Sequence, residues 1–116
     1  LVHDPVFTPN VGRFAQGMLV NIPLHSVALK NATRASVHEA LTSHYAGQNI
    51  VAVVPLDATD ALSRIDPTEM AGTDNMKLYV CGRADNSQFN LIASLDNLGK
   101  GASGAAVQNL NLMLQG

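Results

Sequence analysis

The stretch NMKLYVCGRADNSQFNLIASLDN, residues 75–97, decides the fold of this chain of 116 residues. Apolar residues recur at every second position twice within it, first at Met76, Leu78 and Val80 and then at Phe89, Leu91, Ala93 and Leu95. A period of two is typical of a β-strand that buries one face. The segment ADNSQ, residues 84–88, separates the two runs with turn-forming residues. The stretch therefore predicts an antiparallel β-hairpin.

Two further strands are predicted upstream of the hairpin. Residues 18–24 alternate in the same way, and Pro23 within them cannot donate to a strand ladder, which favours a sheet edge or a bulge. Residues 49–55, NIVAVVP, have the composition of a buried strand. Between this strand and the hairpin, residues 56–75 form a long irregular connection with room for one helical turn. Connections of that length are often functional.

Two helices complete the pattern. Thr33 is a suitable N-cap for a helix that continues to about Tyr45, with Gly47 placed to stop it. A second helix is predicted for residues 102–114. Its apolar stripe consists of Val107, Leu110 and Leu114. The order strands, helix, strands, helix predicts an α+β fold whose sheet is mixed and largely antiparallel, with the helices packed on it.

Composition narrows the classes of function. A hydrophobic content of 47% allows one compact domain with a core, so we expect a single unit over residues 1–116. The net charge is −2 and the seven lysines and arginines are scattered, which argues against a nucleic-acid partner. No apolar run approaches the roughly 18 residues of a membrane span, and no leader pattern is present. We therefore expect a protein that enters no membrane. The chain has a single cysteine and hence no internal disulfide, which fits a reducing compartment, so we expect it to be cytoplasmic.

Three glycines, Gly99, Gly101 and Gly104, have the spacing G-x-G-x-x-G of dinucleotide-binding loops. Such a loop opens a βαβ unit, with a second strand and an acidic residue about 20 positions further on. The residues after Met113 cannot supply that strand. We therefore interpret the glycines as a place where a helix approaches another backbone closely, although the helix start beside Lys100 also suits an anionic group.

Two longer stretches resemble a known enzyme family. LDNLGKGASGAAVQNLNLM, residues 95–113, resembles the C-terminal signature of N-acetyl-gamma-glutamyl-phosphate reductase, in which an Asp-Asn-Leu-x-Lys-Gly-Ala run leads into the last helix. VFTPNVGRFAQGMLVNIPL, residues 6–24, resembles that family's Phe-x-Pro segment and the strand after it. The resemblance spans nearly the whole chain and is closest to the shorter, second type of the enzyme. It departs at Gln16, where many members carry arginine, so a substrate contact at this position is in doubt.

The resemblance implies a fold and an activity. For residues 1–116 it implies an α+β domain like the C-terminal domain of glyceraldehyde-3-phosphate dehydrogenase, which carries the substrate-side and dimer contacts. It also implies a Rossmann NADP-binding domain, which would lie in the same parent chain outside residues 1–116. The implied reaction is the NADPH-dependent reduction of an acyl phosphate, N-acetylglutamyl phosphate, to the semialdehyde in arginine biosynthesis. The implied partners are this small-molecule substrate and a second copy in a homo-oligomer.

The resemblance also implies roles for individual residues. Asn97 would bind the nicotinamide carboxamide, for which an amide offers both a donor and an acceptor. Gly99, Lys100 and Gly101 would lie along the cofactor, and Asn75 would lie on the substrate side. The alternative for both asparagines is an ordinary capping or turn role.

No catalytic residue is predicted within the chain. The family's nucleophile motif, Gly-Cys-Tyr-Pro-Thr, and its histidine-rich base segment are not found in residues 1–116, so we expect this fragment alone to be inactive. Cys81 lies in the middle of a predicted strand, with no neighbouring histidine and no helix start to lower its pKa. We interpret it as an inert structural thiol.

Other polar residues favour ordinary structural roles. His3, His25, His38 and His44 lack the spacing of metal ligands, so no metal site is predicted. A solvated loop is the favoured interpretation of the acidic residues Asp57, Asp60, Asp66 and Glu69. Composition and periodicity leave two rivals open: a separate α+β ligand-binding or dimerisation module, and the equivalent domain of a related enzyme such as aspartate-semialdehyde dehydrogenase.

Overall fold

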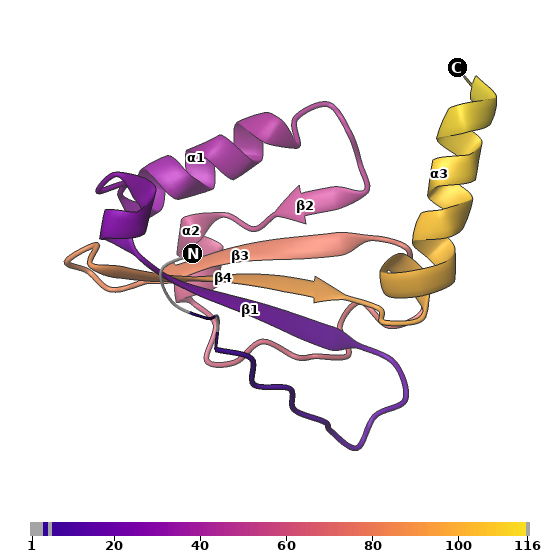
Figure 1. The fold of residues 1–116 in the computed structure, drawn as a ribbon, viewed down its shortest axis with the longest axis horizontal. Coiled ribbons are helices and arrows are strands. Elements are labelled where there is room, and N and C mark those ends of the chain that lie inside the picture. The colour runs from indigo at the N-terminus through magenta and orange to yellow at the C-terminus, as the bar shows by residue number, and fades with distance from the viewer. Residues whose placement is uncertain (1–3, 5, 116) are drawn as a thin grey trace.

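Four strands form one mixed sheet in the order β1-β4-β3-β2, in a computed structural model that describes residue 4 and residues 6–115. The strands are β1 (Met18–His25), β2 (Val51–Val53), β3 (Met76–Gly82) and β4 (Gln88–Leu95). The helices are α1 (Arg34–His44), α2 (Leu56–Asp60) and α3 (Gly104–Gln115), with a 3-10 turn η1 (Ser26–Leu29) and a π-type turn η2 (Gly99–Ser103). Figure 1 shows this arrangement, which confirms the predicted α+β class.

The hairpin predicted from residues 75–97 is the centre of the sheet. β3 and β4 pair antiparallel from Met76 opposite Leu95 to Gly82 opposite Phe89. At the turn between them, Asn86 has a φ of 55° and the Asp85 side chain accepts the backbone N–H of Ser87 at 2.9 Å. Asparagine tolerates this left-handed conformation well, and an aspartate side chain can close such a turn on its own backbone.

The two outer strands differ in how well the sequence predicts them. β1 pairs antiparallel with β4 and forms one edge of the sheet, as the position of Pro23 indicated. β2 pairs parallel with β3 but is only three residues long, shorter than residues 49–55. Before it, the Gln48 side chain accepts the N–H groups of Ile50 and Val51 at 2.8 Å each. After it, Pro55 has no N–H and starts α2 instead.

Helix α1 begins where the capping pattern placed it. The Thr33 side chain accepts the N–H of Ser36 at 3.1 Å, and the Ser36 hydroxyl accepts the N–H of Thr33 at 3.0 Å. This reciprocal pair satisfies two helix-end donors and confirms the predicted N-cap. The imidazole of His38 then lies 3.0 Å from the Val54 carbonyl oxygen, which ties the helix to the segment after β2.

The register divides the sheet into two faces. The face that carries Val20, Ile22 and Val80, here called the apolar face, packs against α1 on its β2 and β3 side, where Val80 is fully buried. Over β1 the same face stays open, and Met18, Val20 and Ile22 are 37%, 38% and 45% exposed. The irregular segment 61–75 covers part of the opposite face. Residues of that face buried beneath it are Tyr79, Ile92 and Ser94.

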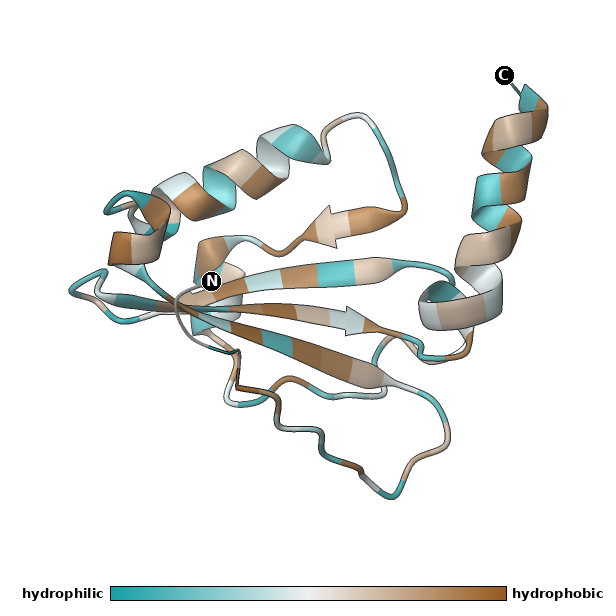
Figure 2. Ribbon diagram, in the orientation of Figure 1, coloured by the Kyte–Doolittle hydropathy of each residue, from teal (hydrophilic) through white to brown (hydrophobic). Residues whose placement is uncertain are grey.

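Helix α3 projects from the end of the sheet (Figure 1). It packs chiefly against η2, and its large apolar side chains from Val107 to Leu114 are between 53% and 79% exposed. Figure 2 shows hydrophobic residues along both β1 and α3. The radius of gyration is 15.5 Å, against about 13 Å for a compact domain of this length. The accessible surface is 8292 Å², against about 6,000 Å² for a compact monomer of this mass. The domain therefore has apolar surface that the described residues, 4 and 6–115, do not cover.

Candidate cofactor-side turn

The residues singled out in the sequence come together at one end of the sheet. This is the end where β4 finishes and where β1 and β3 start, because Leu95 is opposite both Met18 and Met76. Three segments meet there, namely residues 16–17, residues 72–75 and residues 96–101. These segments contain all five predicted site residues, namely Asn75, Asn97, Gly99, Lys100 and Gly101.

Asp96 lies at the centre of this end and is 1% exposed. Its Oδ1 accepts the N–H groups of Leu98 and Gly99 at 2.8 and 3.2 Å. Its Oδ2 accepts the N–H of Gly72 at 2.7 Å and the side-chain amide of Gln16 at 3.2 Å. Hydrogen bonds from the backbone N–H groups of Leu98, Gly72 and Gly99 hold the pKa of this carboxyl below its usual range against the effect of burial.

Asn97 carries one structural bond and one free donor group. Its Oδ1 accepts the backbone N–H of Gly17 at 2.9 Å. Its amide nitrogen donates to no partner within residue 4 and residues 6–115. Because an amide oxygen has two lone pairs and the amide nitrogen two hydrogens, the half-buried side chain keeps both donor and acceptor capacity.

The glycine motif serves the packing of the turn. A Cβ atom on Gly99 would lie 2.5 Å from the Thr73 carbonyl oxygen, and one on Gly104 would collide with the Asp74 carboxylate. On Gly101 it would lie 3.1 Å from the Asp96 carbonyl oxygen. The glycines thus let η2 and the start of α3 press against residues 72–74 and 96, which agrees with the close-approach interpretation of the motif.

The start of α3 already has an anionic neighbour. The Asp74 carboxylate touches Gly104, the first residue of α3. Lys100 donates from Nζ to the Gln108 side chain at 2.6 Å, and Gln108 in turn donates to the Asp74 carbonyl oxygen at 2.9 Å. A carboxylate beside the positive end of the helix dipole weakens the case for a bound phosphate at this point.

Asn75 directly precedes β3 and is exposed. Its backbone N–H lies 3.4 Å from the Thr73 hydroxyl, and its side chain makes no hydrogen bond within the part of the chain that the structure describes. The side chain is thus available to a ligand on the same end of the sheet as Asn97.

The sequence of the chain matches that of a known protein family. The family profile described as "Semialdehyde dehydrogenase, dimerisation domain" matches residues 2–97, which include the whole sheet and end at Asn97. The chain belongs to this family. Membership agrees with the α+β architecture of the domain and with its open apolar face.

Similar proteins carry a more specific name. The chain is 60% identical over 111 residues to the N-acetyl-gamma-glutamyl-phosphate reductase of Rhizobium etli, covering 95% of the chain and 36% of that relative. It is 60% identical over 115 residues to the protein of that name from Rhizobium meliloti, covering 98% of the chain and 37% of the relative. The Brucella ovis protein of that name matches with 60% identity over 111 residues, covering 95% of the chain and 36% of the relative. The chain spans about a third of the length of these relatives.

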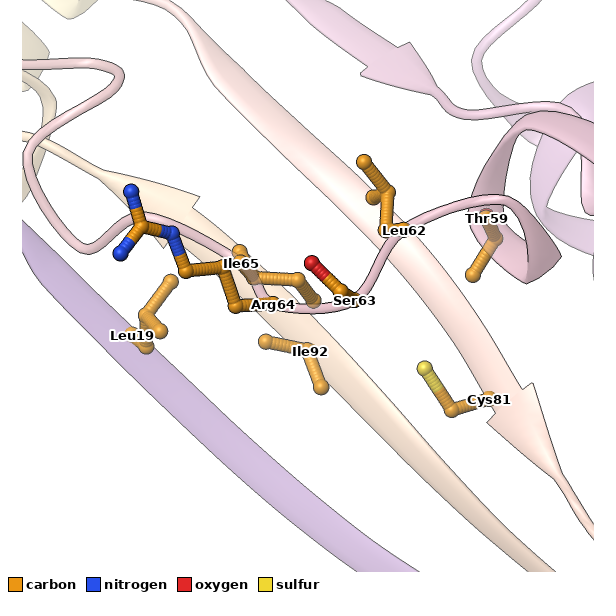
Figure 3. A pocket seen from close by; sticks show the side chains of 8 residues that line it. All are labelled: Leu19, Thr59, Leu62, Ser63, Arg64, Ile65, Cys81 and Ile92. Carbon is orange, nitrogen blue, oxygen red and sulfur yellow. The ribbon is translucent and has the colours of Figure 1, made fainter.

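Cys81 of the dimerisation domain faces a pocket on the opposite side of the sheet from α1. Figure 3 shows the side chains that line this pocket between the sheet and the segment that carries Leu62 and Ser63. The volume of the pocket is about 340 Å³. The Cys81 sulfur points toward that segment. Burial raises the pKa of the thiol, and the charge of Arg34 offsets this only in part. A thiol held in its protonated form is a poor nucleophile, in agreement with the inert role expected for it.

Two acidic residues of the connection do not fit the interpretation as a solvated loop. The Glu69 carboxylate accepts the Tyr79 hydroxyl at 2.7 Å and the Lys77 ammonium at 2.9 Å. Burial raises the pKa of Glu69, but the hydrogen bonds from Lys77 and Tyr79 outweigh it, so that the pKa lies below its usual value. Asp60 pairs with Arg34 at 2.8 Å. The interpretation was therefore wrong for Glu69, whose side chain is only 19% exposed and is bound by Lys77 and Tyr79. Asp60 lies in α2 rather than in a loop, but its side chain is 62% exposed and therefore solvated.

Neither a metal centre nor a membrane span can be located among the residues described. Residue 4 and residues 6–115 contain no group of three or more histidine, cysteine, aspartate or glutamate side chains that could hold a metal ion. His3 lies outside these residues. Within the same part of the chain, no helix combines the length and the apolarity needed to cross a bilayer.

The sequence interpretation missed the residues that organise the turn. The family signature contains Asp96 and Gln108 but indicates no contact for either, and Gln16 stands out in the sequence only as a departure from the family pattern. The available signal was the pair Asp96–Asn97 directly after a strand, because a carboxylate at a strand end often accepts the N–H groups of the following turn.

Proposed function

We propose that this domain is part of an N-acetyl-gamma-glutamyl-phosphate reductase, which reduces N-acetylglutamyl phosphate to the semialdehyde with NADPH. The 60% identity to proteins of this name along nearly the whole chain supports the proposal. We also propose that the Rossmann domain that binds most of the cofactor lies in a part of the same protein outside residues 1–116, since the relatives are longer than this chain.

The observation that carries the proposal is the amide nitrogen of Asn97 at the end of the sheet, which has no hydrogen-bond partner among residue 4 and residues 6–115. A nicotinamide carboxamide has one acceptor and one donor group, and the Asn97 side chain offers a free NH₂ and a second lone pair on Oδ1. When bound, NADPH supplies the hydride for the reduction. Gly99 and Gly101 let the turn next to Asn97 pack closely on the carbonyl oxygens of Thr73 and Asp96, which holds the turn in place beside the proposed cofactor position. Asn75 faces the substrate from the neighbouring loop.

Within this proposal, residues 1–116 alone do not catalyse the reaction. The only thiol of the chain belongs to Cys81, whose pKa is raised by burial. None of the histidines described forms a hydrogen bond with it. The domain instead supplies one wall of the active site and the surface for self-association. The open apolar face over β1 fits that surface, since exposed apolar patches of this kind mark protein interfaces.

The full-length protein tests the assignment directly. Reduction of NADP would be followed with N-acetylglutamate semialdehyde and phosphate, and in parallel with aspartate semialdehyde and phosphate. Turnover with the N-acetylated substrate alone is the expected result. A preference for aspartate semialdehyde would show that the domain belongs to an aspartate-semialdehyde dehydrogenase. If NADP is reduced with neither substrate, the result would favour a separate binding module. Turnover by residues 1–116 that survives Cys81→Ser would contradict the inactivity of the fragment.

A further inference from the structure

Asp96 connects three segments of the chain by accepting hydrogen bonds from each of them. Its carboxylate binds residue 16, residue 72 and residues 98–99, and its carbonyl oxygen accepts the N–H of Gly101 at 2.8 Å. We propose that Asp96 is a positioning residue that holds the turn from Asn97 to Gly101 in the arrangement that receives the cofactor. This inference rests on the proposed function.

The chemistry of the site requires a carboxylate. Every group that points at the two side-chain oxygens is a donor, two on Oδ1 and two on Oδ2. Only an ionised carboxylate presents acceptors in both directions. An asparagine at this position would direct its NH₂ group either at the N–H groups of Leu98 and Gly99 or at those of Gly72 and Gln16. Hydrogen bonds to a charged acceptor are also stronger than those to a neutral one.

The bonds of Asp96 fix the direction in which Asn97 points. Asp96 directly precedes Asn97 and accepts the N–H of Leu98, which directly follows it, while the Asn97 oxygen accepts the N–H of Gly17. The amide nitrogen is thereby directed to the one side that has no protein partner among the described residues. Gly99 packs against the Thr73 carbonyl oxygen, next to the Gly72 N–H that Asp96 binds, so the turn cannot shift without breaking these contacts.

Asp96 itself does not reach a ligand, because it is 1% exposed and both oxygens are engaged. Its effect must pass through Asn97 and the glycine turn. A residue of this kind sets how well the site is organised before the cofactor arrives, and loss of such preorganisation lowers affinity without removing any direct contact.

The test uses Asp96→Asn in the full-length protein, with Asp60→Asn as a control. Asp60 loses the same charge but pairs with Arg34, which binds the Val80 carbonyl oxygen, away from the turn. Three quantities would be measured: the dissociation constant of NADPH from its fluorescence, the Michaelis constant for the acyl phosphate, and amide hydrogen exchange in residues 72 and 97–101.

The expected result for Asp96→Asn is an NADPH dissociation constant at least tenfold higher and faster exchange in the turn. The Michaelis constant for the acyl phosphate should rise less than this, since Asp96 also binds Gly72 in the segment that carries Asn75. Asp60→Asn should leave all three within twofold. An unchanged NADPH affinity in Asp96→Asn would overturn the inference. An equal rise in both constants would overturn it too, because it would indicate general damage.

Two further outcomes are informative. If Asp96→Asn does not fold, Gln16→Ala takes its place, since it removes one of the four side-chain bonds. It should raise the NADPH dissociation constant about threefold without changing the melting temperature, and an unchanged constant would overturn the inference. If the wild-type protein binds no NADPH, the proposed function fails. The amide exchange rates of wild type and Asp96→Asn then decide whether Asp96 orders the turn. Equal rates in the two proteins would overturn this ordering role.

Discussion

The Asn97 side chain accepts the backbone N–H of Gly17 at 2.9 Å, although the two residues are 80 positions apart. The bond connects the residue before β1 to the end of β4, next to the pair formed by Met18 and Leu95. Gly17 is buried, so its N–H has no access to water if Asn97 is removed. Asn97 therefore stabilises the fold in addition to the role proposed for it with the cofactor.

Substitution of Asn97 should affect stability and cofactor binding separately. Asn97→Ala leaves a buried donor unsatisfied, so we expect the free energy of unfolding to fall by about 1–3 kcal/mol. Asn97→Asp keeps an acceptor for Gly17 and should recover part of that loss. The recovery is incomplete because the new charge lies next to the Asp96 carboxylate. Denaturant unfolding of the two variants measures the difference.

The same pair of variants tests the cofactor contact. Both lack the amide hydrogens, so both should bind NADPH less tightly than wild type by about 1–3 kcal/mol. The binding measurement is made at a temperature at which each variant is fully folded. If Asn97→Asp binds NADPH as tightly as wild type, the asparagine is structural only.

Gly17 itself should be among the least replaceable residues. Its φ is +116°, and a Cβ atom there would collide with the carbonyl oxygen of Pro67. For Gly17→Ala we expect a loss of about 2–4 kcal/mol in the free energy of unfolding, from backbone strain and overpacking together. Gly47→Ala is the matched control, because Gly47 also has a positive φ, +78°, but open space around it. Strain alone should cost it about 1 kcal/mol. Equal losses in the two variants would contradict the role of the Pro67 contact.

The local part of this fold could be predicted from the sequence. The alternation in residues 76–95 gives β3 and β4, and the capping residue Thr33 gives the start of α1, because both features depend on neighbours a few positions away. The length of β2 could not be predicted, since the strand begins where the Gln48 side chain accepts the backbone N–H groups of Ile50 and Val51. Interactions over 24 or 80 positions, such as those of Asp96 with Gly72 and Gln16, leave no periodic trace in the sequence.

In the candidate site, too, some features could be predicted from the sequence and others could not. The resemblance singled out Asn75, Asn97, Gly99, Lys100 and Gly101, and the structure brings these residues to one end of the sheet, while their roles toward ligands stay predictions. The resemblance did not indicate that Lys100 is bound to Gln108 or that Asp74 lies at the start of α3. Those contacts arise from the packing of α3 against the turn.

Glu69 should make the stability of the domain sensitive to acid. Its pKa in the folded protein is lowered from the usual 4.5, so its contribution is fully present above that value and is lost as the pH falls through the folded pKa. Glu69→Gln should be less stable than wild type by about 1 kcal/mol at neutral pH. The difference should shrink below about pH 4. Urea unfolding from pH 3 to pH 7 measures it.

Tyr79→Phe provides the comparison for this prediction. It removes the hydroxyl that donates to Glu69 at 2.7 Å but keeps the ion pair with Lys77. The folded pKa of Glu69 should then rise toward its usual value. The loss of stability in acid should still begin near the pKa of the unfolded chain, but it should be smaller than in wild type and complete at a higher pH. An acid profile of Tyr79→Phe identical to that of wild type would show that the Tyr79 bond does not lower the pKa of Glu69.

Self-association should depend on the open half of the apolar face. Ile22 is 45% exposed there, so Ile22→Asp should cost the isolated subunit less than about 1 kcal/mol. An unpaired carboxylate buried in an interface is far more costly, so we expect the dissociation constant of the oligomer to rise at least 100-fold. Asn21→Asp is the control, because Asn21 lies on the opposite face of β1 and an aspartate there still accepts the hydrogen bond from Asn90. Sedimentation velocity over a range of concentrations distinguishes the two. Dissociation of Asn21→Asp but not of Ile22→Asp would place the interface on the opposite face of the sheet.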